Sequence, residues 1–280
     1  MESVASVMNR LIQQVLEVKG ECPHCFEPLF GWKTKNKDGS ERCQPTCMKC
    51  GYSDLKRKED RQTQRMYNNS LKTRALNFFE NGSIVTDKEL FNSRLNNYKE
   101  LDSETKRAKE LAKSFINELM LNKNTHLILN GKTGTGKSHL SMAVCWEVIE
   151  RSSYNKKCLF INYRELLEQL KFSFNDEEAR KAIQGNLIAD IKTTDLVVID
   201  DLGSELGGNG LKGATSYNND VLYSILEARQ NMPLIVNTNL TGPEIKQAYG
   251  DRILSRILRN SNEHVFTFEQ STDKRIKGVS

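Results

Sequence analysis

Short apolar runs alternate with segments of helical periodicity in the C-terminal two thirds of the chain. We expect a helix that begins at Ser103, and buried strands separated by helical segments at residues 126–130, 158–162, 196–200, 234–238 and 264–268. Buried strands that alternate with helices are typical of a parallel sheet covered by helices on both faces. The pattern therefore predicts an α/β domain over residues 91–280.

The N-terminal third has a different pattern. Apolar residues recur at helical spacing between positions 4 and 16, which predicts an amphipathic helix that either covers a small module or docks on a partner. Residues 56–90 are polar and charged apart from a short apolar stretch, which indicates a basic linker with a helical segment. We expect a boundary near residue 90 and a separate domain over residues 1–55.

Charge is distributed unevenly along the 280 residues. The net charge is +5 at pH 7, but 12 Lys or Arg and only 5 Asp or Glu lie between Lys33 and Arg74. Contact with nucleic acid or an acidic partner is therefore expected in this segment. No apolar run approaches the roughly 18 to 20 residues that span a bilayer, and no secretory leader is visible. We expect a cytoplasmic protein that does not contact a membrane.

Five of the seven cysteines lie close together near the N-terminus. Two C-x-x-C pairs are separated by 21 residues, which is close to the spacing of a four-cysteine zinc ribbon. We expect a structural Zn²⁺ held by four thiolates, those of Cys22, Cys25, Cys47 and Cys50. Cys43 and His24 are alternative ligands. A redox role is less favoured, because a redox C-x-x-C normally lies at the strand–helix junction of a thioredoxin-like unit.

The strongest motif follows the first strand of the α/β domain. Residues 131–138 read GKTGTGKS, and a helical pattern follows, so the G-x-x-x-x-G-K-S motif lies in the strand–loop–helix setting of a phosphate-binding P-loop. Backbone N–H groups wrap the phosphates, Lys137 reaches the β- and γ-phosphates, and Ser138 offers its hydroxyl to Mg²⁺. The expected nucleotide-binding residues are Gly131, Thr133, Gly134, Thr135, Gly136, Lys137, Ser138, His139 and Asp200.

Two carboxylates follow another buried strand about sixty residues later. Asp200 and Asp201 end the run LVVIDD, at the edge where open α/β sheets bind ligands. We expect Asp200 to hold Mg²⁺ and Asp201 to orient or deprotonate the attacking water, although an aspartate pair at this place can also cap a helix. Asn239 follows the next strand and is predicted to sense the γ-phosphate from the same edge.

The helix predicted over residues 251–260 has an apolar stripe and three arginines on its other faces. Arginines in this arrangement commonly form a solvated surface. Phosphoryl transfer, however, gains greatly from an arginine that reaches the γ-phosphate from a neighbouring subunit, so Arg256 is a candidate for such a group.

Four segments, in order, resemble one family. GKTGTGKS, LVVIDDLGSE, PLIVNTN and YGDRILSRI lie within about 130 residues and are similar to the AAA+ ATPase domain of DnaC/DnaI-type replicative helicase loaders and the related IstB transposition ATPases. The resemblance covers roughly residues 90–280. The cysteine-rich domain ahead of it is most similar to DnaI and its bacteriophage counterparts. If the protein is phage-encoded, we expect it in the cytoplasm of the host.

The resemblance implies roles for individual residues. Asn239 matches sensor 1, Arg256 matches the arginine finger with Arg252 beside it, and Arg275 matches the sensor 2 arginine. Asp201 stands where many AAA+ proteins have Glu, and this shorter carboxylate suggests slow, switch-like hydrolysis. The sequence after Arg275 leaves no room for a separate lid domain. We therefore expect neighbouring subunits or a helicase to complete the pocket.

Four residues match positions at which similar loaders contact single-stranded DNA. Sequence-tolerant binding requires cations for phosphates and aromatic rings for base stacking. Aromatic side chains such as Phe172 and Phe174 are, however, also common in cores. The expected DNA contacts are Lys171, Phe174, Thr215 and Tyr217.

The leading hypothesis is an ATP-dependent loader that uses ATP, Mg²⁺ and structural Zn²⁺. Its N-terminal domain would bind a DnaB-type replicative helicase, and its ATPase domain would bind single-stranded DNA and self-associate on the helicase. The alternative is an IstB-like accessory ATPase of transposition, which the cysteine-rich domain disfavours. A small-metabolite kinase is weakened by Asn239 and the arginine helix, because a monomeric kinase does not need them.

Overall fold

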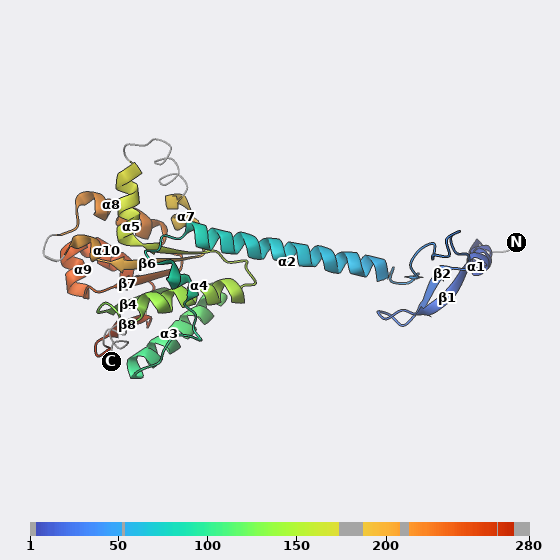
Figure 1. The fold of residues 1–280 in the computed structure, drawn as a ribbon, viewed down its shortest axis with the longest axis horizontal. Coiled ribbons are helices and arrows are strands. Elements are labelled where there is room, and N and C mark those ends of the chain that lie inside the picture. Colours follow the sequence, from blue (N-terminus) through green and yellow to red (C-terminus); the bar gives the residue numbers. More distant parts are fainter. Residues whose placement is uncertain (1–3, 52–53, 174–186, 208–212, 262, 272–280) are drawn as a thin grey trace. The chain divides into compact units, whose positions relative to one another are not determined.

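The computed structural model describes residues 4–51, 54–173, 187–207, 213–261 and 263–271, with the side chains of 4–6, 8, 9 and 54–56 left aside (Figure 1). The chain divides into two compact units, Met1–Ser70 and Leu71–Ser280. The division falls within the long helix α2 (Asp54–Gly82). Among the described residues, no helix combines the length and the apolar character that crossing a bilayer requires.

The N-terminal unit combines one helix with a small antiparallel sheet. Helix α1 (Val4–Val15) leads directly into β1 (Leu16–Glu21), which pairs with β2 (Pro28–Trp32); β2 in turn pairs with β3 (Thr46–Cys47). The predicted N-terminal helix is confirmed. Val7, Leu11 and Val15 lie four residues apart along α1, and all three side chains are exposed.

The C-terminal unit is built on a five-stranded parallel sheet. The strands are β4 (His126–Gly131), β5 (Cys158–Asn162), β6 (Leu196–Leu202), β7 (Leu234–Thr238) and β8 (Val265–Phe268). Their order is β5-β6-β7-β4-β8, and every pair is parallel. All five strands lie where the apolar runs predict them, and β4, which leads into the P-loop, is an interior strand.

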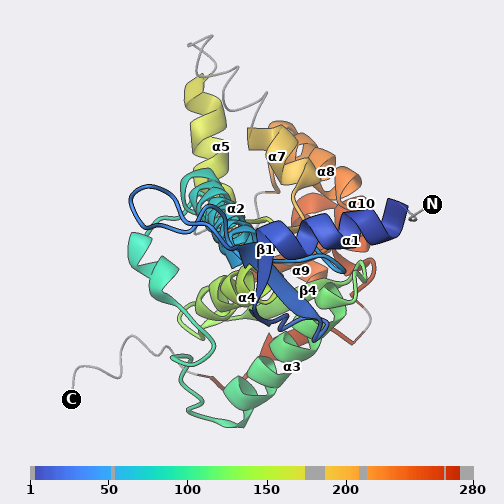
Figure 2. The same cartoon turned by 90° about the vertical axis from the view of Figure 1, so that its right-hand side faces the viewer.

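Alternate residues of β4, β5, β6 and β7 belong to two different cores, because successive side chains of a strand point to opposite faces. Leu127 and Leu129 of β4 pack in one core, which also contains residues of α2, α3 (Ser103–Met120) and α4 (Lys137–Arg151). Ile128 packs in the other, with α5 (Tyr163–Phe172), α7 (Ile188–Thr193), α8 (Ser216–Ala228), α9 (Gly242–Tyr249) and α10 (Asp251–Leu258). Figure 2 shows α3 and α4 on one side of the strands and α5, α7 and α8 on the other.

The segment between Leu71 and residue 90 belongs to the C-terminal unit, which differs from the boundary predicted near residue 90. Phe79 of α2 is fully buried in the first core and meets the ring of Trp146 edge-on, with ring centres 5.0 Å apart. Ile84 forms a parallel bridge with Ile161 of β5. The mostly polar composition concealed this packing, because the end of α2 buries one narrow apolar face and leaves its other side chains in solvent.

The end of β8 is fixed by an acidic side chain at the start of α3. The buried carboxylate of Glu104 accepts backbone hydrogen bonds from Glu269, Gln270 and Ser271, with N···O distances of 2.9 to 3.1 Å. Burial opposes ionisation of Glu104, but these hydrogen bonds outweigh it and lower its pKa. This anchor holds β8 in place next to the beginning of the P-loop.

Candidate functional site

The P-loop joins the carboxyl end of β4 to the N-terminus of α4. Gly134 and Gly136 have positive φ angles, +82° and +99°, which favour glycine at both positions. Gly131 lies so close to β8 that a Cβ atom there would meet the Cβ of Phe268 at 2.7 Å. The glycines of the motif are therefore required by the loop itself, and the loop directs the N–H groups at the start of α4 toward one place, as a phosphate site needs.

Lys137 closes the P-loop from inside. Its buried ammonium donates hydrogen bonds to the carbonyl oxygens of Gly131 at 2.5 Å and Lys132 at 2.9 Å. Thr135 is also buried, and its hydroxyl donates to the Lys132 carbonyl at 3.0 Å. These contacts hold the loop in a closed turn with the lysine already at its centre.

Asp200 lies at the centre of a buried polar network. Its Oδ1 accepts hydrogen bonds from Ser138 at 3.0 Å and from the amide of Asn237 at 2.7 Å, and Ser141 in turn donates to Asn237 at 2.8 Å. Burial raises the pKa of Asp200 to about 6, and the hydrogen bonds from Asn237 and Ser138 oppose this rise. A serine hydroxyl beside a buried carboxylate is a donor set that suits Mg²⁺.

Asp201 has an environment unlike that of its neighbour. It is exposed, and its φ of +58° takes it out of the regular strand, where the pairing of β6 with β7 shifts between Ile199 and Leu202. Adjacent carboxylates on one strand would point to opposite faces, but this backbone turn allows both to line the same cavity. One carboxylate is thus buried beside the P-loop and the other is open to solvent.

A cavity of about 490 Å³ lies over the P-loop and the two aspartates. Its lining contains P-loop residues predicted from the motif, among them Thr133, Lys137 and Ser138. His139 also lines it, and the Nε2 atom of this histidine lies 2.9 Å from the side-chain oxygen of Asn97. All of the predicted nucleotide-binding residues except Gly131 and Thr135 therefore line one cavity.

One wall of the cavity comes from a segment that the motif analysis did not single out. Tyr98 is buried, and its ring meets that of His139 edge-on with centres 5.4 Å apart. Arg94, in the same segment, stacks its guanidinium 3.9 Å from the centre of the Trp146 ring on α4. No motif marks this segment in the sequence. The residues missed by the prediction are Thr86, Leu90, Asn97, Tyr98, Lys99 and Asn162.

The polar side chain that β7 brings to Asp200 is that of Asn237. Asn237 is fully buried, whereas Asn239 is exposed in the turn after the strand and is not among the described residues that line the cavity. An asparagine inside an otherwise apolar strand was the available signal for Asn237. The sensor role of Asn239 remains a prediction.

The predicted arginine residues lie at another opening or outside the described residues. The guanidinium of Arg256 pairs with Glu227 at 2.7 Å, donates to the hydroxyl of Tyr223 at 2.7 Å and stacks on the Tyr223 ring. Arg252 is exposed at the start of α10. Arg275 lies outside the described residues.

The predicted DNA contacts have different surroundings. Lys171 is exposed at the end of α5, and the adjacent Phe172 is 81% exposed, so Phe172 is not a core residue. Phe174 lies outside the described residues. Thr215 is exposed and caps α8, where its hydroxyl accepts a hydrogen bond from the backbone N–H of Asn218 at 3.2 Å. Tyr217, in contrast, is half-buried against the second core.

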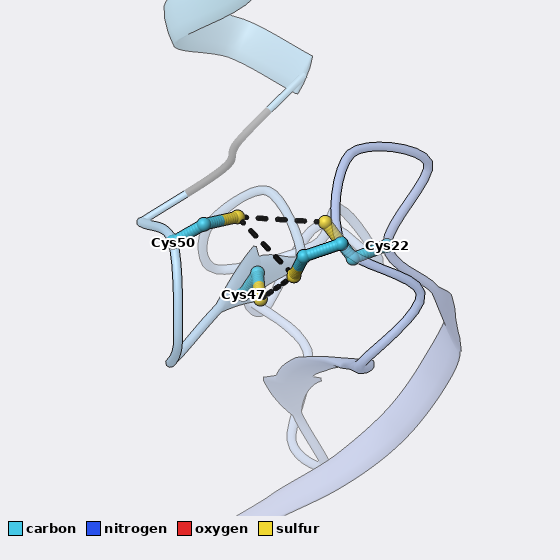
Figure 3. A group of neighbouring side chains, drawn as sticks. Cys22, Cys47 and Cys50 are labelled. Carbon is cyan, nitrogen blue, oxygen red and sulfur yellow. Dashed lines mark hydrogen bonds between the residues drawn. The ribbon is translucent and has the colours of Figure 1, made fainter.

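The N-terminal unit brings four cysteines together (Figure 3). The Sγ atoms of Cys22, Cys25, Cys47 and Cys50 all lie within 4.8 Å of one another, and three of the separations are 3.5 to 3.6 Å. Four sulfurs bound at about 2.3 Å to a tetrahedral Zn²⁺ would be about 3.8 Å apart. The donor set and its spacing are therefore compatible with zinc.

Cys43 and His24 are both exposed, and neither belongs to this group of four thiols. Backbone hydrogen bonds from Cys50 and Lys49 outweigh burial and lower the pKa of Cys47 to about 7. Gly51, with a φ of +66°, ends the second turn. A thiol that ionises near neutral pH suits metal binding, because the ligand is the thiolate.

A family model described as IstB-like ATP binding protein matches residues 57–272. The match spans more than half of the chain and includes the whole cavity lining. The chain belongs to the IstB-like ATP-binding protein family. All four clustered cysteines lie ahead of the matched residues.

This IstB-like chain is also similar to a curated helicase loader. It is 28% identical over 154 residues to the replicative helicase loader DnaC of Escherichia coli (strain K12), which covers 54% of this chain and 57% of that protein. The match thus spans less than two thirds of the length of that relative.

Two solved structures show the same fold as the IstB-like chain. The DnaC helicase loader gives a TM-score of 0.54 at 16% identity and covers 65% of this chain and 100% of that one. DnaI gives 0.53 at 22% identity, with 67% and 96% covered. These likenesses and the strand order identify the fold as that of AAA+ P-loop ATPases.

Proposed function

We propose that this protein is an ATP-dependent loader that places a DnaB-type hexameric helicase on single-stranded DNA at the start of replication. Curated relatives named replicative helicase loader support this function. The N-terminal unit binds the helicase, and the C-terminal unit binds single-stranded DNA and self-associates on the helicase. Nucleotide state determines when the helicase is released.

The observation that carries the proposal is the sequence similarity to replicative helicase loaders. The described lining of the cavity contains no arginine, which supports a site shared between copies. Lys137 and the P-loop amides supply cation and N–H groups from one side, but phosphoryl transfer gains from an arginine on the γ-phosphate. Arg256 lies instead at a separate surface opening lined by Gln230, Ser255, Leu258 and Arg259. An arginine that lies at a surface away from its own nucleotide cavity can reach the cavity of an adjacent copy. This arrangement is expected of an ATPase whose sites are shared between copies, as when several copies assemble on a hexamer.

In the proposed reaction, Lys137 and the P-loop bind the phosphates of ATP, and Ser138 and Asp200 hold Mg²⁺. The exposed Asp201 orients or deprotonates the water that attacks the γ-phosphate. Asn239 contacts the γ-phosphate, and Arg256 of a neighbouring copy stabilises the charge that develops during transfer. Arg275 completes the site as the sensor 2 arginine. A carboxylate as short as that of Asp201 supports slow, switch-like hydrolysis.

The four clustered cysteines hold one structural Zn²⁺ in the N-terminal unit. Four protein thiolates leave no coordination position for a substrate, so the ion stabilises the small sheet and has no catalytic role. The sulfur separations support this assignment. A sheet of three short strands has little core of its own, and metal binding supplies much of its folding free energy.

The alternative is an IstB-like accessory ATPase of transposition. The match of residues 57–272 to the IstB-like family model is compatible with it but does not separate the two functions, because the nucleotide machinery is common to both. The cysteine cluster lies ahead of that matched segment and favours the loader instead.

Co-purification separates the two functions. The full-length protein, tagged, is mixed with the replicative helicase and, separately, with a transposase from the same genome, each with ATP or with ADP. We expect a stable complex with the helicase that ATP favours. Binding to the transposase and not to the helicase would replace the loader by the alternative.

A further inference from the structure

The backbone around the proposed catalytic carboxylate is held in an uncommon conformation. Asp201 has a φ of +58°, in the left-handed region that non-glycine residues rarely adopt. Such a conformation persists only where surrounding contacts fix it. The residues that follow Asp201 show what those contacts are.

Leu202 and Gly203 are tied to the turn after β7. The hydroxyl of Thr238 donates to the Leu202 carbonyl at 2.8 Å. Gly203 has a φ of +104°, and a Cβ atom there would lie 2.7 Å from the side chain of Leu240. Only glycine, which has no Cβ atom, therefore fits at position 203, where the chain leaves β6.

Glu205 fixes the other side of this turn. Its Oε2 accepts the backbone N–H of Gly203 at 3.0 Å, and its Oε1 accepts the hydroxyl of Tyr249 from α9. Tyr249 is only 5% exposed, so its ring is held by the second core. Burial raises the pKa of Glu205, while these two contacts and the residue's own backbone amide oppose the rise. Glu205 thus links a rigid helix to the amide two residues beyond Asp201.

The C-terminal end of α9 also contacts the chain at Ala214. The carbonyl of Ala248 accepts the N–H of Ala214 at 3.0 Å, just before α8 begins. Consecutive residues of α9, Ala248 and Tyr249, therefore contact both sides of the connection between β6 and α8. These contacts make α9 the support on which the residues after Asp201 rest.

We propose that Glu205 and Tyr249 are positioning residues for Asp201: they fix the turn after β6 so that the Asp201 carboxylate faces the nucleotide cavity and the attacking water. The inference rests on the proposed ATP hydrolysis. Neither residue lines the described cavity, so neither touches the nucleotide. Their effect is on the chemical step, because precise placement of a catalytic group lowers the barrier without changing ground-state binding.

Three substitutions test this role. Tyr249→Phe removes one hydroxyl, Glu205→Ala removes both acceptors, and Glu205→Gln keeps the size of the side chain and one oxygen for the Gly203 amide, while the Tyr249 hydroxyl accepts from the new amide group. Tyr163→Phe is the matched control, since Tyr163 is also a buried tyrosine, but its hydroxyl donates to the carbonyl of Asn218 at 2.6 Å. Each full-length variant is assayed for kcat and KM of ATP hydrolysis and for amide hydrogen exchange of residues 200–207.

We expect Glu205→Ala to lower kcat about tenfold or more and Tyr249→Phe to lower it severalfold, with KM for ATP within about twofold of the unmodified protein. Glu205→Gln should restore most of the activity, and Tyr163→Phe should retain it. Exchange at residues 200–207 should become faster in Glu205→Ala and Tyr249→Phe but not in the control.

Unchanged kcat and unchanged exchange in Glu205→Ala would overturn the proposal. Loss of activity in Glu205→Gln equal to that in Glu205→Ala would also overturn it, because the negative charge and not the position would then matter. If the unmodified protein does not hydrolyse ATP, the proposed activity fails, whereas the exchange measurement still decides whether Glu205 and Tyr249 order the segment that contains Asp201.

Discussion

The side-chain amide of Asn237 donates a 2.7 Å hydrogen bond to the buried carboxylate of Asp200. Burial raises the pKa of Asp200 to about 6, and this hydrogen bond favours the charged form. Only the carboxylate binds Mg²⁺, so Mg²⁺-dependent nucleotide binding should weaken as the pH falls below about 6. Asn237→Leu should raise the pKa further and lower Mg²⁺ affinity at pH 7 by about tenfold. A titration of Mg²⁺ against protein with bound ATP, repeated between pH 5.5 and 8, measures both effects.

Asn239→Leu is the control for this substitution, because Asn239 is exposed in the turn after β7 and is not among the described residues that line the cavity. It should leave the Mg²⁺ titration unchanged while it lowers hydrolysis. Equal Mg²⁺ affinity of Asn237→Leu and the unmodified protein at every pH would contradict the assignment of Asp200 as the metal-binding carboxylate.

Lys137→Ala and Asp201→Asn should affect different steps. Lys137 lies inside the P-loop, and in the proposed reaction it contacts the phosphates of ATP, so its loss should weaken nucleotide binding. In the same proposal Asp201 acts on the attacking water, so Asp201→Asn should keep ATP affinity and lose hydrolysis. Equilibrium binding of a fluorescent ATP analogue and steady-state hydrolysis give the two quantities. Hydrolysis by Asp201→Asn at the rate of the unmodified protein would refute the assigned base.

Metal analysis tests the cysteine cluster. Purified protein should contain about one Zn²⁺ per chain, and Cys47→Ser should lose the metal and unfold the N-terminal unit, because metal binding and folding are coupled. Cys43→Ser is the matched control: Cys43 is exposed and lies outside the cluster, so this variant should retain the metal. Zinc loss from both variants alike, or no zinc in the unmodified protein, would contradict the assigned ligand set.

Arg256 should act on the nucleotide of a neighbouring copy. Arg256→Ala removes contacts with Glu227 and Tyr223 at the surface, so folding and ATP affinity should remain nearly intact. DNA-stimulated hydrolysis should fall, by about a thousandfold or more for a fully effective arginine finger and by less for a slow loader. Arg259→Ala, at the same opening, is the control and should retain activity.

Mixing Arg256→Ala with Lys137→Ala protein shows whether the site is shared. Each variant lacks a different half of the shared nucleotide site, so mixed oligomers contain some complete sites and should recover part of the activity. Mixtures that form oligomers but remain as inactive as their components would show that Arg256 acts within its own chain or only structurally.

The sequence predicted the sheet well because strands buried on both faces form short apolar runs, as at Leu196–Leu202 and Leu234–Thr238. The P-loop was equally clear, since its glycines are fixed by backbone geometry. Thr241 and Glu244 have the T-x-x-E spacing of a capping box, and this box is present at the start of α9.

Other parts of the site depend on contacts between residues far apart in the sequence. Tyr98 reaches the cavity through packing against His139, 41 positions away, and no local pattern indicates this contact. The link between Glu205 and Tyr249 is similar, because each residue alone resembles an ordinary loop or helix side chain. The division between Ser70 and Leu71 differs from the expected boundary near residue 90 for the same reason, because the short apolar stretch at the end of α2 packs on Trp146, which is distant in the sequence.

The most direct test of the account is a loading assay on circular single-stranded DNA with an annealed, labelled oligonucleotide. A closed circle offers no end for a helicase ring to thread, so displacement of the oligonucleotide by the DnaB-type helicase of the same genome reports loading. We expect displacement to require this protein, ATP and an intact Lys137. Displacement at the same rate without the protein, or with Lys137→Ala in its place, would contradict the proposed ATP-dependent loading.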